Sequence, residues 1–267
     1  AILALGGEAE ATRAYATKSP LTADAGLELS FLQGVAASLA AQLPWAEGRG
    51  ERPFHYPVPE VLERADYGRT VNIAVTGPSG VGKSLFVNNV RGVTFGDPTW
   101  APVGVSETTA QPTPYVFPGE PRVRLWDMEG AGCEWNPENT SERYIRKVGL
   151  RYFDVVLVLS CRRFGDIEHD LIKELHTNSV PHFFVHTKLD VDITSNIQDN
   201  KQPPEETERK IRDDLCTCGI EEAYLINVRE LDKFDFPRLF RDVLLALAEP
   251  LHEIATTYEM PEDALVA

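Results

Sequence analysis

Short apolar runs alternate with amphipathic segments along the chain from Val71 onward. The runs are rich in β-branched residues, which indicates strands, and the segments between them have helical spacing. The predicted strands are residues 71–76, 123–127, 154–160, 182–187 and 223–227. The predicted helices lie near residues 83–91, 141–150, 167–178, 205–216 and 236–251. This alternation predicts an α/β fold in which a mostly parallel central sheet is flanked by helices.

Residues 1–65 have a different pattern. They are rich in alanine, and between Ala25 and Leu43 the apolar residues recur close to helical spacing. Pro44 and a stretch of Gly, Arg and Glu then interrupt the segment. We therefore predict a helical N-terminal flank over residues 1–65.

The overall composition excludes some classes of partner. The chain has 267 residues, which is enough for one large domain with an attached segment. Its 26 Lys and Arg against 41 Asp and Glu give a net charge of −15, so no broad basic field is present to bind nucleic acid. The 4 Cys are compatible with a reducing compartment, and no apolar run approaches the ~20 residues of a spanning helix. We expect a cytoplasmic protein, with any membrane contact peripheral.

A glycine-rich loop, residues 77–84, follows the first predicted strand and opens a helix. It matches G-x-x-x-x-G-K-[S/T], in which backbone N–H groups and the helix N-terminus converge on phosphates. The lysine of such a loop reaches the β- and γ-phosphates, and its serine ligates Mg²⁺. The residues predicted to bind nucleotide here are Gly77, Ser79, Gly80, Val81, Gly82, Lys83 and Ser84. A simple glycine-rich turn is the alternative, and the strand and helix on either side oppose it.

A second motif, Asp-Met-Glu-Gly at residues 127–130, ends the next confident strand. In a D-x-x-G segment, Asp127 would hold Mg²⁺ through water and the Gly130 N–H would contact the γ-phosphate. An aspartate and a glycine also commonly end a strand in a turn. The upstream phosphate loop favours the nucleotide interpretation.

A third motif, Thr187-Lys188-Leu189-Asp190, follows another apolar run. The Asp190 carboxylate can accept hydrogen bonds from both N1–H and the 2-amino group of guanine, whereas adenine presents an acceptor at N1. The Lys188 stem would lie along the purine. The motif therefore predicts guanine as the base.

Two further segments belong to this set. Residues 105–109, Val-Ser-Glu-Thr-Thr, lie between the first two motifs, where GTPases keep a switch threonine that meets Mg²⁺ and the γ-phosphate. Spacing alone does not decide between Thr108 and Thr109, and a polar surface loop is the alternative. After the last predicted strand, Asn227 and Val228 occupy the place of a guanine-contacting loop.

These residues resemble one family, the immunity-related (interferon-inducible) GTPases of the dynamin-like branch of P-loop GTPases. The similarity covers roughly residues 65–250 and is most specific at residues 186–194, His-Thr-Lys-Leu-Asp-Val-Asp-Ile-Thr. Residues 71–77, 125–127 and 235–237 are also similar to the family. One departure is Glu129, which stands where the family usually has proline.

The resemblance implies a G domain over residues 66–250, with residues 251–267 as the start of a truncated C-terminal helical region or a tail. It implies GTP-dependent self-association into a dimer or oligomer and peripheral action on intracellular membranes in innate defence. It also assigns the Mg²⁺ role to Thr109 and places Glu107 at an acidic position linked to hydrolysis.

The motifs together predict hydrolysis of GTP to GDP and phosphate, with Lys83, Mg²⁺ and loop amides stabilising the developing charge. Ala131 follows Gly130, where Ras-like enzymes carry a water-positioning glutamine. Turnover should therefore be slow alone and depend on Glu107 or on a partner chain. The alternatives are a GTP-binding switch or scaffold without hydrolysis, and an ATP-using P-loop enzyme, which Asp190 opposes.

Overall fold

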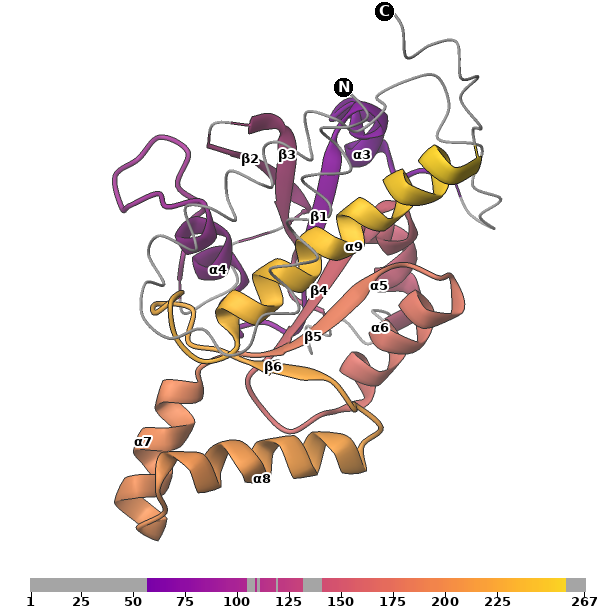
Figure 1. The fold of residues 1–267 in the computed structure, drawn as a ribbon. Helices are drawn as coiled ribbons and strands as arrows, with labels where there is room; N and C mark the ends of the chain where they lie inside the picture. The colour runs from indigo at the N-terminus through magenta and orange to yellow at the C-terminus, as the bar shows by residue number, and fades with distance from the viewer. Residues whose placement is uncertain (1–56, 105–108, 110, 119, 132–140, 258–267) are drawn as a thin grey trace, which may run out of the picture.

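A sheet with helices on both faces forms the centre of the molecule (Figure 1). The computed structural model describes residues 57–104, 109, 111–118, 120–131 and 141–257. The strand order in the 6-stranded sheet is β2-β3-β1-β4-β5-β6. All neighbours pair in parallel except β2, which runs antiparallel to β3 at one edge. The strands are β1 Val71–Thr76, β2 Thr113–Phe117, β3 Glu120–Asp127, β4 Val155–Ser160, β5 His182–His186 and β6 Ala223–Leu225.

The helices form a layer on each face of this sheet. The helices are α3 Glu60–Arg64, α4 Lys83–Val90, α5 Ser141–Val148, α6 Asp166–Thr177, α7 Leu189–Asn200, α8 Pro204–Thr217 and α9 Phe236–Thr257. Short 3-10 turns cover Tyr67–Arg69 and Leu150–Tyr152. Helices α4 and α9 cover one face, and α5 and α6 cover the other, while α7 and α8 extend beyond β6 (Figure 1).

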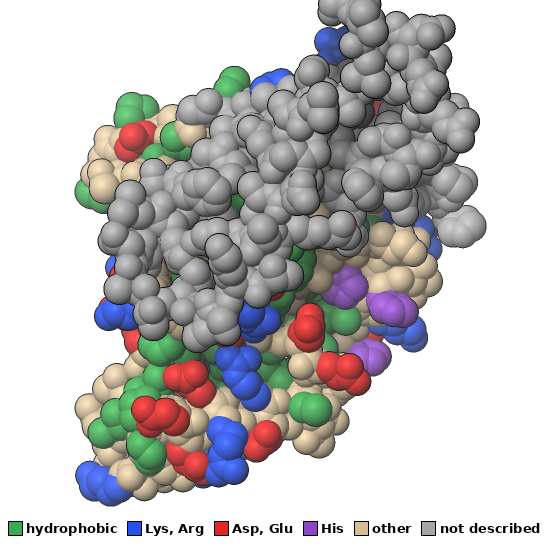
Figure 2. Space-filling view, in the orientation of Figure 1, with side chains coloured by type: hydrophobic (Ala, Val, Ile, Leu, Met, Phe, Trp, Pro, Cys, Tyr) green, Lys and Arg blue, Asp and Glu red, His purple; other side chains and the backbone are tan. Residues whose placement is uncertain are grey.

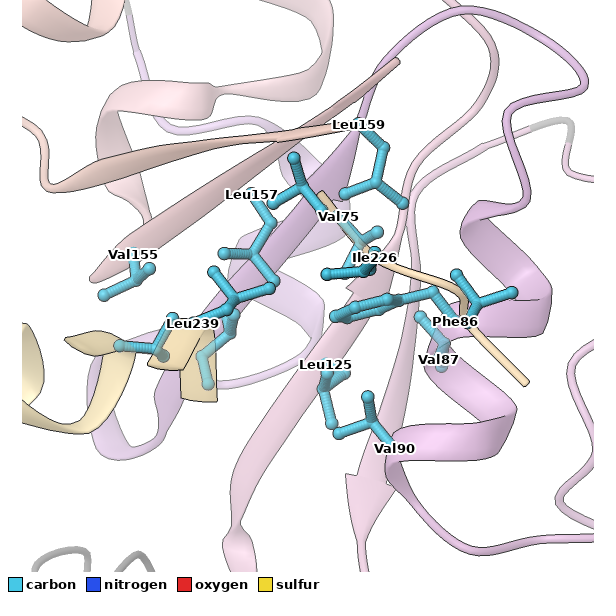
Figure 3. Packing of buried hydrophobic residues seen from close by; sticks show 14 of the residues in the cluster. Val75, Phe86, Val87, Val90, Leu125, Val155, Leu157, Leu159, Ile226 and Leu239 are labelled. Atoms are coloured by element: carbon cyan, nitrogen blue, oxygen red, sulfur yellow. The ribbon is translucent and has the colours of Figure 1, made fainter. Parts of the chain in front are cut away.

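Alternation along the central strands assigns each side chain to one of these two layers. In β1 and β4, Val75 and Leu157 point toward α4 and α9, where they pack with Phe86 and Leu239 (Figure 3). The intervening positions, such as Ala74, belong to the opposite layer under α5 and α6. Burying one such Val, Leu or Phe side chain contributes about 1.5–3 kcal/mol. Strands that are buried on both faces read as continuous apolar runs, which is why the sequence identified them.

The structure confirms the predicted α/β fold class, with a mostly parallel sheet between helices. Two elements were not predicted. Strand β2 contains Pro114, which argues against a strand in the sequence, yet an edge strand tolerates a proline. Helix α7 buries only Leu189, so it shows no apolar face.

The ends of some elements also differ from the prediction. Helix α9 was expected to finish near Pro250, but it continues to Thr257. A proline removes one backbone hydrogen bond without obliging the helix to end there. Most of the predicted flank over residues 1–65 lies outside the described residues, and the described part of it contains the short helix α3.

Charged side chains of both signs lie close together on one part of the surface. Figure 2 shows acidic and basic side chains interspersed over the part of the molecule that contains α7 and α8. Among the described residues, no helix combines the length and the apolar character that crossing a membrane requires.

Candidate nucleotide-binding site

The sequence motifs meet at one edge of the sheet, where the parallel strands present their carboxyl ends. Ligands of open α/β sheets bind at this edge, in the crevice formed by the loops that leave the strands. The loops that follow β1, β5 and β6 are residues 77–82, 187–188 and 226–235, and the described part of the loop after β3 is residues 128–131. The fold therefore brings the four motif segments together, although they are far apart in the sequence.

The loop after β1 has a backbone that requires glycine. Gly77 has φ 137°, and a Cβ at this position would lie 2.1 Å from the carbonyl oxygen of Leu159. Gly82, with φ 97°, directly precedes the first residue of α4. The segment after β5 also holds this loop, since the Thr187 hydroxyl donates to the carbonyl oxygen of Val81 at 2.7 Å. These contacts fix the glycine-rich loop directly before the N-terminus of α4, the kind of helix end that binds anions.

Lys83 lies folded under this loop, and only 8% of the residue is exposed. Its Nζ donates to the carbonyl oxygens of Gly77 at 3.0 Å and Pro78 at 2.9 Å. A buried ammonium is costly unless an opposite charge accompanies it. The Asp127 carboxylate lies close enough to interact with this ammonium, and a phosphate bound by the loop would add further negative charge.

Three oxygen-bearing side chains converge beside Lys83. The hydroxyl groups of Ser84 and Thr109 donate to the same Asp127 oxygen, Oδ2, at 2.6 Å and 2.9 Å. The other carboxylate oxygen, Oδ1, is buried and has no hydrogen-bond partner among the described residues. Burial raises the pKa of the Asp127 carboxyl, although the two hydroxyl groups and the charge of Lys83 oppose that shift.

This oxygen cluster fits a small, hard cation such as Mg²⁺. That ion prefers oxygen ligands, keeps several waters, and is bound through one or two protein groups together with substrate phosphates. The unpartnered Asp127 Oδ1 offers one more acceptor for such a hydrated ion. Of the two threonines that spacing did not separate, Thr109 lies against Asp127, while Thr108 and Glu107 lie outside the described residues.

The segment after β3 is fixed alongside the glycine-rich loop. The Met128 N–H donates to the Val75 carbonyl at 3.2 Å, and the Ala131 N–H donates to the Gly77 carbonyl at 3.1 Å. Gly130 therefore lies in a short span whose two ends are tied to β1 and to the loop that follows it. The backbone on both sides of Gly130 is therefore fixed next to the glycine-rich loop.

The predicted base-recognition residues lie at the far end of the same edge. Lys188 has φ 61° and caps α7, and Asp190 lies in the first turn of that helix. The Leu189 N–H donates to the Ile226 carbonyl at 3.3 Å, which joins this turn to the segment after β6. Thr187 is fully buried, and its hydroxyl donates to the Val81 carbonyl, so it joins this segment to the glycine-rich loop.

The segment after β6 is anchored by residues that the sequence did not reveal. The Asn89 side chain, from α4, donates to the Val228 carbonyl at 2.6 Å. The Asn227 side chain accepts from the Arg229 N–H at 3.0 Å and donates to Glu230 at 2.8 Å, so it stabilises its own loop. No pattern in the sequence indicated Asn89, because its role depends on a contact between positions 139 residues apart.

Asp235 closes that loop at its other end. Its carboxylate accepts from the Leu225 N–H and from Arg212. Burial opposes ionisation of this carboxyl, but the Leu225 N–H and the two arginines, Arg212 and Arg238, outweigh it and lower the pKa. The loop that carries Asn227 and Val228 therefore has a fixed base.

A glycine-rich loop between β1 and α4, a carboxylate after β3 and base-recognition loops after β5 and β6 define a P-loop G domain. Comparison with known proteins agrees with this class. The family model described as Interferon-inducible GTPase (IIGP) matches residues 55–258. The chain belongs to the interferon-inducible GTPase family, which confirms the family resemblance.

Curated relatives support this assignment. Interferon-inducible GTPase 5 of Rattus norvegicus is 36% identical over 179 residues, covering 63% of this chain and 38% of the relative. T-cell-specific guanine nucleotide triphosphate-binding protein 2 of Mus musculus is 32% identical over 198 residues, covering 68% of this chain and 45% of the relative. The matched region thus spans less than half the length of these relatives.

Among solved structures, the chain is similar to the FeoB G-domain from Methanococcus jannaschii. The TM-score is 0.42 at 15% sequence identity, and the match covers 67% of this chain and 97% of that chain.

Proposed function

We propose that this chain binds guanine nucleotide together with Mg²⁺ and hydrolyses GTP to GDP and phosphate. The observation that carries the proposal is the convergence of Ser84, Thr109 and Asp127 beside the buried Lys83 ammonium. Membership of the interferon-inducible GTPase family supports the same chemistry.

Each group of the site has a defined part in this reaction. Water attacks the γ-phosphorus in line, and a new P–O bond forms as the bond to the β,γ-bridging oxygen breaks. The Lys83 ammonium neutralises charge that grows on the phosphoryl oxygens, and amide groups at the start of α4 donate to them. Ser84, Thr109 and Asp127 would hold Mg²⁺, which would supply further positive charge near the phosphates.

Guanine recognition is assigned to the loops after β5 and β6. Asp190 would accept hydrogen bonds from N1–H and the 2-amino group, and the Lys188 stem would lie along one face of the purine. Asn227 and Val228 would line the base from the neighbouring loop, which Asn89 holds in place.

Slow turnover by a single copy is a further part of the proposal. Ala131 stands where a glutamine would orient the attacking water, and its methyl group can make no hydrogen bond. Glu107 is proposed to assist hydrolysis, on the basis of the family resemblance. Self-association of copies, peripheral membrane contact and a role in innate defence are proposed on the same basis, with the G domain over residues 66–250.

Phosphate release measured against protein concentration tests this function. We expect the turnover per molecule to rise with concentration, because association of copies would supply a group that orients the attacking water, which Ala131 cannot do. A constant, low turnover with tight GTP binding would indicate a switch or scaffold instead. Absence of guanine nucleotide binding at any concentration would overturn the proposal.

Removing the Thr109 hydroxyl tests the Mg²⁺ assignment. In Thr109→Ala, the Mg²⁺ concentration for half-maximal GTP turnover should rise about tenfold, which corresponds to about 1.4 kcal/mol. The matched control is Thr113→Ala, because the Thr113 hydroxyl donates to the Gln111 carbonyl instead. Identical Mg²⁺ midpoints for Thr109→Ala and the unaltered chain would exclude Thr109 as a ligand.

A further inference from the structure

Helix α5 contacts the nucleotide site through the buried hydroxyl group of Tyr144. Tyr144 lies in α5, on the face of the sheet opposite α4 and α9, and only 1% of the residue is exposed. Its hydroxyl donates to the carbonyl oxygen of Glu129 at 3.0 Å and lies 2.8 Å from the Thr76 hydroxyl. A phenol has one proton, so the Thr76 hydroxyl is the donor in the second contact.

The two partners of Tyr144 belong to different parts of the site. Thr76 is the last residue of β1 and directly precedes Gly77, and Glu129 directly precedes Gly130. Tyr144 thereby links the start of the phosphate loop to the D-x-x-G segment. Hydrogen bonds in such a buried position are stronger than on the surface, because water does not compete for them.

The same helix holds the side chain of Glu129. Lys147 lies three positions after Tyr144, on the same side of α5. Its Nζ donates to Glu129 Oε2 at 2.7 Å, and the glutamate side chain is 11% exposed. The lysine side chain is 55% exposed, so the ion pair is worth less than the buried tyrosine contact. Glu129 is therefore fixed at both its backbone carbonyl and its carboxylate.

This fixation determines the direction of the neighbouring N–H group. The Glu129 carbonyl and the Gly130 N–H belong to one planar peptide unit and point in opposite directions. A carbonyl oxygen held by the Tyr144 hydroxyl consequently directs the Gly130 N–H away from α5. A proline at position 129 would restrict the backbone covalently, whereas this chain restricts it through α5.

We propose that Tyr144 and Lys147 are positioning residues that orient the Glu129-Gly130 peptide for the terminal phosphate and so set the preference for a triphosphate over a diphosphate. The inference rests on the proposed function and names a further part of the same site. Thr76, the other partner of Tyr144, is also held in β1 by its pairing with β4, whereas the Glu129 carbonyl orients the segment for the γ-phosphate. The diphosphate should therefore bind nearly as well without the Tyr144 hydroxyl.

Calorimetric titration of the full chain with GDP and with the non-hydrolysable analogue GppNHp tests this inference. Tyr144→Phe keeps the ring in the core and removes the hydroxyl. We expect its affinity for GppNHp to fall about tenfold and its affinity for GDP to change less than about twofold. Lys147→Gln, on the surface of α5, should lower GppNHp affinity about threefold with GDP unaffected.

Two variants serve as controls. Tyr152→Phe removes another phenol from the same buried cluster, and Arg146→Gln removes an α5 cation that pairs with Glu142 instead. Both should leave the GppNHp to GDP affinity ratio unchanged. An equal loss for both nucleotides in Tyr144→Phe, or an unchanged ratio in both test variants, would overturn the inference while leaving the proposed function intact. Failure of the unaltered chain to bind either nucleotide would instead overturn the proposed function, and with it this inference.

Discussion

Replacing Lys83 with alanine is expected to lower the affinity for GTP more than about a hundredfold. Hydrogen bonds to charged groups contribute about 1.5–3 kcal/mol each, and the ammonium is also the nearest positive charge to the predicted β- and γ-phosphates. The fold should survive, because alanine removes only side-chain contacts of Lys83, among them the hydrogen bonds to the Gly77 and Pro78 carbonyls, and leaves the backbone of the loop unchanged. Calorimetric titration with GTP and Mg²⁺ measures the loss.

The matched control for this substitution is Lys173→Ala. Lys173 lies exposed in α6, on the face of the sheet opposite α4. Its replacement should leave GTP affinity unchanged. Thermal unfolding of both variants separates loss of binding from loss of structure. GTP affinity in Lys83→Ala equal to that of the unaltered chain would refute the phosphate-loop assignment.

The sequence was sufficient for the centre of the fold because buried parallel strands have a strong pattern. In β1 and β4 every position is buried, so both faces require apolar or small residues. At the edges this requirement weakens. Most positions of strand β2 are partly exposed, and the strand contains a proline. Helix α7 buries one residue. Neither element therefore has the regular spacing of apolar residues that would predict it from the sequence.

The same physical limit applies to the site. Motifs located the loops, because glycine at positive φ and a carboxylate at a strand end are local requirements. The contacts that hold those loops are not local. Asn89 to Val228 and Tyr144 to Glu129 depend on which helix covers which strand, and a single sequence carries no record of that pairing. Spacing did not choose between Thr108 and Thr109; the family resemblance chose Thr109, and the fold shows its hydroxyl against Asp127.

Replacing Asp190 with asparagine is expected to change which base is preferred. The asparagine oxygen can still accept from N1–H, but its amino group meets the 2-amino group of guanine, which is also a donor. Affinity for GTP should therefore fall about a hundredfold or more, because the asparagine amino group and the guanine 2-amino group are both donors and cannot hydrogen-bond to each other. Xanthine carries a carbonyl at C2, and this acceptor matches the asparagine amino group. XTP should consequently bind more tightly to Asp190→Asn than GTP does.

Competition against a labelled guanine nucleotide by GTP, XTP and ATP measures this change. Asp192→Asn is the matched control, because Asp192 lies in the same helical turn but its carboxylate pairs with His186 at 2.8 Å. That variant should keep the preference for GTP. Loss of GTP binding in Asp190→Asn without a gain for XTP would mean that Asp190 supports the loop rather than reads the base. Equal competition by ATP and GTP in the unaltered chain would instead favour an ATP-using enzyme, because a carboxylate that faced the base would reject the acceptor at adenine N1.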